Sequence, residues 1–390
     1  MSVHTNDPPW GSSWAFVTIL ALGTFAVSTD AFIVAGLLPS MATTLRVSVA
    51  AAGQSVTIFA MTYAVFAPIL ATGAAKIPRR TLLVGALLVL GLANLGAALA
   101  PNFTVLLIFR ALAAVGAAVY TPTAGAVAAA VARPAARGRA LAIVVGGLTV
   151  ATVVSVPLGY LANAWVGWRI TLSLVAVLCF IIGLAIFLVL PIFIGGTPVP
   201  LLTRLAVLRQ RGVVKVLPLT VLGMAASYTV YAYSVPAFQA VGISSDAIGA
   251  FLLVYGLGAV LGSIGCGYAT DRWGAIRVLS VTYSVMTVAL GVLAWLAIRS
   301  TTAPEGIIGL LVGLWGASTW SQTPPQQHRL VAAAPHEIPL TLSLNASAIY
   351  LGIGSGTALG GVALTAGVPV VYGAGAGMAA LALFYLKATA

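Results

Sequence analysis

Long runs of apolar residues, separated by short segments rich in Pro, Gly and charged residues, repeat along the whole chain. The runs are continuous and lack the alternation of a β-strand, and most reach the length of about 20 residues that spans a bilayer as a helix. Twelve runs cover residues 14–39, 51–73, 81–100, 103–131, 139–163, 169–192, 214–238, 247–269, 276–298, 306–328, 339–363 and 368–387. The pattern therefore predicts an all-α membrane protein with twelve transmembrane helices.

The composition indicates that lipid is the solvent for most side chains. Hydrophobic residues make up 61% of the chain and charged residues only 6%, whereas about a quarter of the residues of a soluble domain are charged. The two cysteines, Cys179 and Cys266, lie inside apolar runs, where we expect buried thiols rather than a disulfide. The first run is too long for the core of a signal peptide and has no basic segment before it.

The basic residues predict the orientation of the chain. Although the net charge is +12, these residues lie in short loops and form no long basic arm, so no nucleic-acid partner is expected. Of the 18 Lys and Arg residues, Arg46, Arg169 and Arg299 lie in one set of loops and Arg110 lies inside a run. The remaining fourteen lie on the opposite side, which the positive-inside rule makes cytoplasmic. Both termini are therefore expected in the cytoplasm.

The longest loop divides the twelve runs into six and six. We expect an N-terminal half at 1–192, a cytoplasmic linker at 193–213 and a C-terminal half at 214–390. The linker piece 200–211 mixes apolar and basic residues, so it is either a helix on the membrane surface or a plain connection. The halves are weakly similar to each other, which is typical of transporters that bind their substrate between two repeats.

One cytoplasmic loop and four helical segments resemble those of a known family. Gly267-Tyr-Ala-Thr-Asp-Arg-Trp-Gly-Ala-Ile-Arg277 is similar to the Gly-x-x-x-Asp-Arg-x-Gly-x-x-Arg signature of the major facilitator superfamily. Residues 29–39, 156–159 with 167–169, 227–233 and 343–350 resemble, in order, segments of its twelve-helix drug:proton antiporter branch, the bacterial drug and sugar efflux transporters. The resemblance implies two six-helix halves with pseudo-two-fold symmetry.

The resemblance also implies a cytoplasmic gate formed by basic and acidic loop residues. The first-half loop departs from the family pattern, because Ala75 stands where the family commonly has aspartate. Closure of this gate is then expected to depend more on the second-half loop. The gate residues are Lys76, Arg79, Arg80, Asp271, Arg272 and Arg277.

Asp30 is the most informative position in the chain. It is the one of six acidic residues that lies deep inside an apolar run, where a carboxylate is costly and most often functional. Gly36-Leu-Leu-Pro39 is expected to end its helix, which places Asp30 about 12 Å below the external end. Because burial raises a carboxyl pKa and a nearby cation lowers it, Asp30 is the candidate proton-coupling residue. The alternative is a helix-packing aspartate that stays protonated or hydrogen-bonded.

Arg110 lies inside the fourth run and matches the helix 4 arginine of the family. It is expected about 10 Å below the external end of its helix, close to the depth of Asp30. It is a candidate for proton coupling or substrate binding, and the alternative is a structural ion pair or a snorkelling side chain. The sequence leaves open whether the two side chains are in contact.

Aromatic and amide residues in the runs provide candidates for binding the substrate. Each aromatic is equally consistent with a packing or interfacial role, and a buried amide also serves to hold helices together. Gly352, Gly356 and Gly360 are spaced for close helix packing. His328 and His336 are expected in loops, and the run 306–328 is expected to bend near its prolines. The candidates are Tyr63, Tyr120, Tyr231, Trp315, Trp320, Gln326 and Asn345.

Together these features predict a proton-coupled exporter of drug-like molecules or sugars, a monomer in the bacterial inner membrane. We expect no enzymatic activity, no metal and no cofactor other than the proton gradient, since no phosphate-binding glycine loop supports ATP drive. One alternative is an uncoupled sugar or nucleoside facilitator. Another is a sensor or accessory subunit that transports nothing.

Overall fold

The computed structural model describes residues 14–133, 136–191, 200–299 and 303–389. Throughout these ranges the chain forms helices and loops, without a strand. Ten of the helices are long and apolar enough to cross a membrane. A helix satisfies every backbone hydrogen bond within its own segment, which is what a chain surrounded by hydrocarbon requires.

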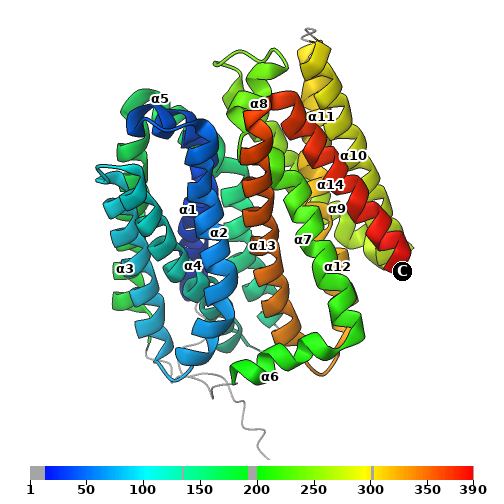
Figure 1. Cartoon of the computed structure of the whole chain (residues 1–390). Coiled ribbons are helices and arrows are strands. Elements are labelled where there is room, and N and C mark those ends of the chain that lie inside the picture. Colours follow the sequence, from blue (N-terminus) through cyan, green and yellow to red (C-terminus); the bar gives the residue numbers. More distant parts are fainter. Residues whose placement is uncertain (1–13, 134–135, 192–199, 300–302, 390) are drawn as a thin grey trace, which may run out of the picture.

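The helices form two groups joined by a short linker element (Figure 1). The first group holds α1 (Trp14–Leu45), α2 (Val49–Gly73), α3 (Arg79–Ala98), α4 (Phe103–Val131) and α5 (Arg137–Val189). The linker holds α6 (Leu201–Ala206) and the 3₁₀ turn η2 (Val207–Arg209). The second group holds α7 (Arg211–Tyr231), α8 (Ser234–Ala240), α9 (Ile248–Trp273), α10 (Ala275–Arg299), α11 (Glu305–Ser321), α12 (Thr323–Ala333), α13 (Ile338–Thr365) and α14 (Val368–Thr389).

Each of the twelve predicted runs has a helical counterpart, although the boundaries differ. The runs 139–163 and 169–192 both lie in α5, which reverses at Gly167 (φ 78°, ψ 162°). Glycine adopts this backbone conformation without a steric penalty, so no separate loop is needed between the two spans. The seventh run is divided between α7 and α8. Residues 200–211 contain the short helix α6, and its position on the membrane surface stays a prediction. Residues 193–199 lie outside the described residues.

The first helix does not end at Pro39 as expected but continues to Leu45. In this extension Thr43 and Thr44 donate their hydroxyl hydrogens to the carbonyls of Pro39 and Ser40 at 3.0 and 2.8 Å. Trp168 in turn donates its Nε1–H to the hydroxyl of Thr44 at 3.1 Å. Asp30 therefore lies 15 residues before the end of α1, about 22 Å along its axis, near the middle of the helix.

The tenth run is divided at Gln322, near the predicted bend, with α11 before this residue and α12 after it. Pro324 and Pro325 lie two and three residues further on, and a proline nitrogen has no hydrogen to donate to the preceding turn. His328 is not in a loop, as expected, but on α12, because the helix resumes after the two prolines. His336 lies in a turn between α12 and α13.

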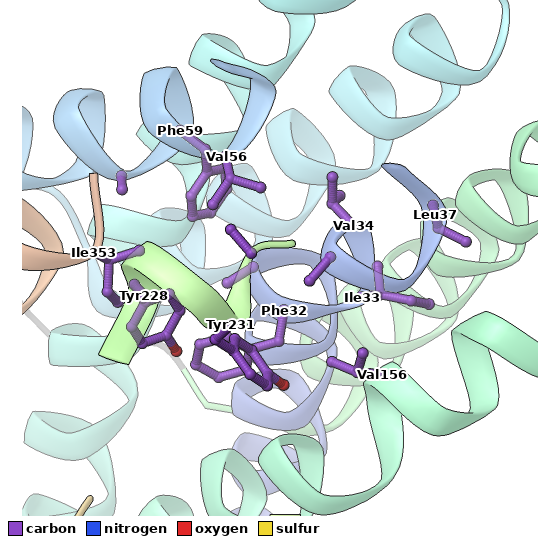
Figure 2. Packing of buried hydrophobic residues seen from close by; sticks show 14 of the residues in the cluster. Phe32, Ile33, Val34, Leu37, Val56, Phe59, Val156, Tyr228, Tyr231 and Ile353 are labelled. Carbon is purple, nitrogen blue, oxygen red and sulfur yellow. The ribbon is translucent and has the colours of Figure 1, made fainter. Parts of the chain in front are cut away.

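The two groups of helices meet along two seams. On one seam α2 packs against α13, which lies beside it at the centre of Figure 1. On the other α5 packs against α9, where a Cβ added to Gly256 would lie 2.6 Å from Val153 Cα. Figure 2 shows residues of α1, α2, α7 and α13 within one buried cluster that is continuous between the groups. A site at this boundary is lined by both halves.

Candidate functional site

Asp30 and Arg110 form an ion pair in the interior of the first half. The Arg110 Nη1 lies 2.6 Å from Asp30 Oδ1, and Arg110 Nη2 donates to the Asp30 backbone carbonyl at 3.3 Å. Both residues are 0% exposed. The pair joins α1 to α4 and is the one ion pair among the described residues, so the contact that the sequence left open is present.

The pair leaves two buried polar atoms without a hydrogen-bond partner, Asp30 Oδ2 and Arg110 Nε. Leaving such atoms unpaired costs about 1–3 kcal/mol each. A structural ion pair normally uses its polar atoms fully. The free carboxyl oxygen is a place where a proton can bind without breaking the contact between Oδ1 and Nη1.

An aromatic row connects this pair to the second half. The Arg110 guanidinium lies 4.5 Å from the centre of the Phe59 ring, and Phe59 in turn lies 6.4 Å from Tyr350 of α13. Tyr63 stacks on Tyr350 with ring centres 3.7 Å apart. Because these rings link the pair to α13, we expect a change in the charge of the pair to affect the packing of α2 against α13.

The second half has a buried polar cluster of its own, formed by Ser227, Tyr255, Thr319 and Trp315. Trp315 Nε1 donates to the Ser227 hydroxyl at 2.9 Å, and the Tyr255 hydroxyl donates to Thr319 at 3.0 Å. Ser227 and Thr319 lie 2.6 Å apart at their oxygens. Tyr231 stacks on Tyr255 at 4.4 Å. The cluster presents uncharged hydroxyl, phenol and indole groups from α7, α9 and α11.

Sequence reasoning identified Trp315 and Tyr231 in this cluster but missed Ser227, Tyr255 and Thr319. The lone signal for them is a polar residue in an apolar run, which many packing positions share. Thr319 also donates to the Trp315 carbonyl one turn earlier, so its hydroxyl is satisfied locally. Only the convergence of α7, α9 and α11 distinguishes these three residues from ordinary packing positions.

Trp320 lies between the halves. Its ring meets that of Phe32 of α1 edge-on, with centres 6.1 Å apart. It also lines a cavity of about 110 Å³ between α5, α9 and α12, together with Thr152, Ser263 and Thr323. Its buried Nε1 has no hydrogen-bond partner. This indole is thus placed to donate a hydrogen bond to a group that enters the boundary between the halves.

The three other substrate candidates have helix-packing contacts. Tyr120 donates to the Leu20 carbonyl at 3.1 Å. Asn345 accepts from the Thr220 hydroxyl at 3.0 Å and so joins α13 to α7. Gln326 donates to the Val216 carbonyl at 3.5 Å. Their role toward a substrate stays a prediction.

The six predicted gate residues lie at the same end of the molecule, at the connections α2–α3 and α9–α10. In the part of the chain that the structure describes, none of them forms an ion pair.

Cys179 and Cys266 are free thiols. The described residues contain no group of three or more His, Cys, Asp or Glu side chains that could hold a metal ion.

The buried ion pair, the two helical groups and the spanning helices are consistent with a membrane transporter. The sequence profile of the Major Facilitator Superfamily matches residues 20–323, and the chain belongs to this family. It is a multi-pass membrane transporter with a small-molecule substrate, and not an enzyme.

Individual relatives cover most of the chain. It is 33% identical over 349 residues to an uncharacterised transporter of the same type, YbcL of Bacillus subtilis, covering 89% of this chain and 88% of that protein. It is 30% identical over 373 residues to the inner membrane transport protein YdhP of Escherichia coli, covering 94% of both. It is 34% identical over 288 residues to a chloramphenicol resistance protein of Streptomyces lividans, covering 72% of this chain and 73% of that protein.

Solved structures show the same fold at low sequence identity. The crystal structure of a D-xylose–proton symporter aligns with a TM-score of 0.78 at 15% identity, covering 96% of this chain and 97% of that one. At this identity the likeness concerns the fold alone.

Proposed function

We propose that the protein is a proton-coupled exporter of small, uncharged organic molecules, drug-like compounds or sugars, from the bacterial cytoplasm. It acts as a monomer in the inner membrane, with both termini cytoplasmic and no cofactor beyond the proton gradient. The observation that carries the proposal is the buried Asp30–Arg110 pair, whose second carboxyl oxygen has no partner. An intramembrane acid of this kind is typical of a proton relay.

The proposed cycle uses the change of charge at Asp30. In one state Asp30 takes up a proton from the outside, which weakens its attraction to Arg110. The two halves then rock about the seams α2–α13 and α5–α9, and Asp30 releases the proton to the cytoplasm. Substrate and proton compete for the region of the pair, so one leaves as the other binds. A ligand shifts such an equilibrium only by its different affinity for the two states.

The polar groups of the interior favour an uncharged substrate. The second half offers the hydroxyl, phenol and indole groups of Ser227, Tyr255 and Trp315, and Trp320 has a free indole donor. The described residues form no ion pair other than Asp30–Arg110. The described interior therefore offers no second charge pair to a charged substrate. The relative in Streptomyces lividans that is named for chloramphenicol resistance supports an antibiotic of this neutral, hydrogen-bonding class.

Asp30→Asn is expected to remove the dependence of transport on the proton gradient. The amide keeps the size of the carboxyl group but cannot take up and release the coupling proton. In proteoliposomes with an imposed pH gradient and chloramphenicol as the probe, accumulation should fall to the level measured without a gradient. Cells of an efflux-deficient host that carry the variant should be as susceptible as cells without the transporter.

Asp246→Asn is the matched control, because it makes the same carboxyl-to-amide change at an exposed loop residue. It should accumulate the probe like the unchanged protein. Full gradient-driven accumulation by Asp30→Asn would refute proton coupling through this residue and favour an uncoupled facilitator. If no member of a neutral compound library is transported by the unchanged protein, the export proposal itself is wrong.

A further inference from the structure

A groove on the outside of the first half combines one cation with an apolar wall. It lies between the start of α3 and the end of α5 and has a volume of about 310 Å³. Phe187 and Leu88 on its wall are 51% and 44% exposed, so the groove opens toward the surroundings of the bundle, which are lipid along a spanning helix. The lining residues are Arg80, Thr81, Val84, Gly85, Leu88 and Phe187.

Arg80 is held at one end of this groove. Its guanidinium carbon lies 4.6 Å from the centre of the Phe187 ring, a contact that orients the side chain without neutralising it. Arg80 is the second residue of α3, a position from which a long cationic side chain reaches the headgroup region. Among the described residues no carboxylate forms an ion pair with it. Its charge is therefore available to an anion from outside the chain.

We propose that an anionic phospholipid occupies this groove, with its phosphate on Arg80 and one acyl chain along Val84, Gly85 and Leu88. A cation at the end of an apolar groove matches the order of groups in a phospholipid. A free phosphate would leave the apolar wall uncovered. Basic pockets at the cytoplasmic ends of spanning helices bind anionic headgroups in this way. The proposed topology makes the lipid one of the cytoplasmic leaflet, and the contact itself does not depend on the transport proposal.

A second groove has a similar composition at the same end of the other half. Arg277 and Trp273 line it with Val278 and Val281, and its volume is about 330 Å³. Trp273 is exposed. Loss of the Arg80 groove should therefore reduce the number of tightly bound anionic lipids and not abolish binding.

Two variants test the Arg80 groove by different routes. Arg80→Gln removes the charge, and Gly85→Leu fills the groove, since a Cβ added at Gly85 meets nothing within 4 Å and leucine favours a helix. Native mass spectrometry of the purified full chain would measure binding of phosphatidylglycerol and of phosphatidylcholine with the same acyl chains. The unchanged protein should prefer the anionic lipid. Both variants should bind it roughly five-fold more weakly at one site.

Controls separate this site from general effects of charge and helix surface. Arg137→Gln removes an exposed charge at the start of α5, and Gly291→Leu adds a leucine at an open glycine of α10. Both should bind lipid as the unchanged protein does, and glycerol 3-phosphate should not displace the bound lipid. Unchanged affinity in both groove variants, or displacement by glycerol 3-phosphate, would overturn the proposal. Because the readout is lipid affinity, neither result bears on proton-coupled export.

Discussion

Replacing Arg110 with leucine is expected to abolish transport and to destabilise the protein by roughly 3–5 kcal/mol. Asp30 is fully buried and has its charged partner at 2.6 Å, so the variant leaves a carboxylate without compensation in the interior. The guanidinium also covers the Phe59 ring, and that contact is lost as well. Thermal unfolding of the purified protein should shift to lower temperature, and proteoliposomes should show no flux.

The double variant Arg110→Leu with Asp30→Asn distinguishes the loss of stability from the loss of transport. Because it removes the uncompensated charge, it should recover much of the stability lost in Arg110→Leu while remaining without gradient-driven transport. Such a cycle isolates the coupling between the two residues. Normal stability and flux in Arg110→Leu alone would show that Asp30 is neutral in the folded protein and that the pair has no role in coupling.

Gly356→Ala is expected to destabilise the protein by at least about 3 kcal/mol, at the upper end for overpacking. The added Cβ would lie 2.4 Å from the Ala225 carbonyl oxygen and 2.7 Å from its Cα, and backbone atoms cannot move aside without shifting α7. A Cβ added at Gly352 would lie 2.6 Å from the Val221 carbonyl oxygen, and one added at Gly360 would lie 2.1 Å from that of Thr229, both on α7. The measurement is the fraction of monodisperse protein after extraction and its unfolding temperature.

Gly377→Ala makes the same change in α14, where a Cβ meets nothing within 4 Å. It should leave the unfolding temperature unchanged or raise it slightly, because alanine is favoured over glycine in a helix by about 1 kcal/mol. If Gly356→Ala is as stable as Gly377→Ala, then α7 and α13 are not held at the close distance that the structure shows.

The spanning segments could be predicted because lipid imposes a length and a composition on each of them, and the family could be predicted because the loop 267–277 resembles its signature. The ends of the helices could not, because they depend on contacts that no single run contains. At Pro39 the sequence predicts an end, yet Trp168, far along the chain, bonds the Thr44 hydroxyl and helps to keep the last turns of α1 in place. Gly167 reverses α5 without a loop for a different, local reason, because glycine adopts its φ of 78° without a steric penalty.

The charged part of the site could also be predicted, since charges inside apolar runs are rare. The contact between Asp30 and Arg110 could not, because depth along two helices does not determine which faces meet. Ser227, Tyr255 and Thr319 were missed because each is ordinary in its own helix, and their significance arises where α7, α9 and α11 converge.

The reversal at Gly167 has a consequence for how the protein meets its surroundings. At that face of the membrane, α1 and α2 are joined by three residues and α3 and α4 by four, and α5 has no connecting loop at all. Proteases and antibodies need a stretch of chain that can leave the folded surface. This face of the first half should therefore resist digestion in intact cells, and epitope tags inserted there should disrupt folding.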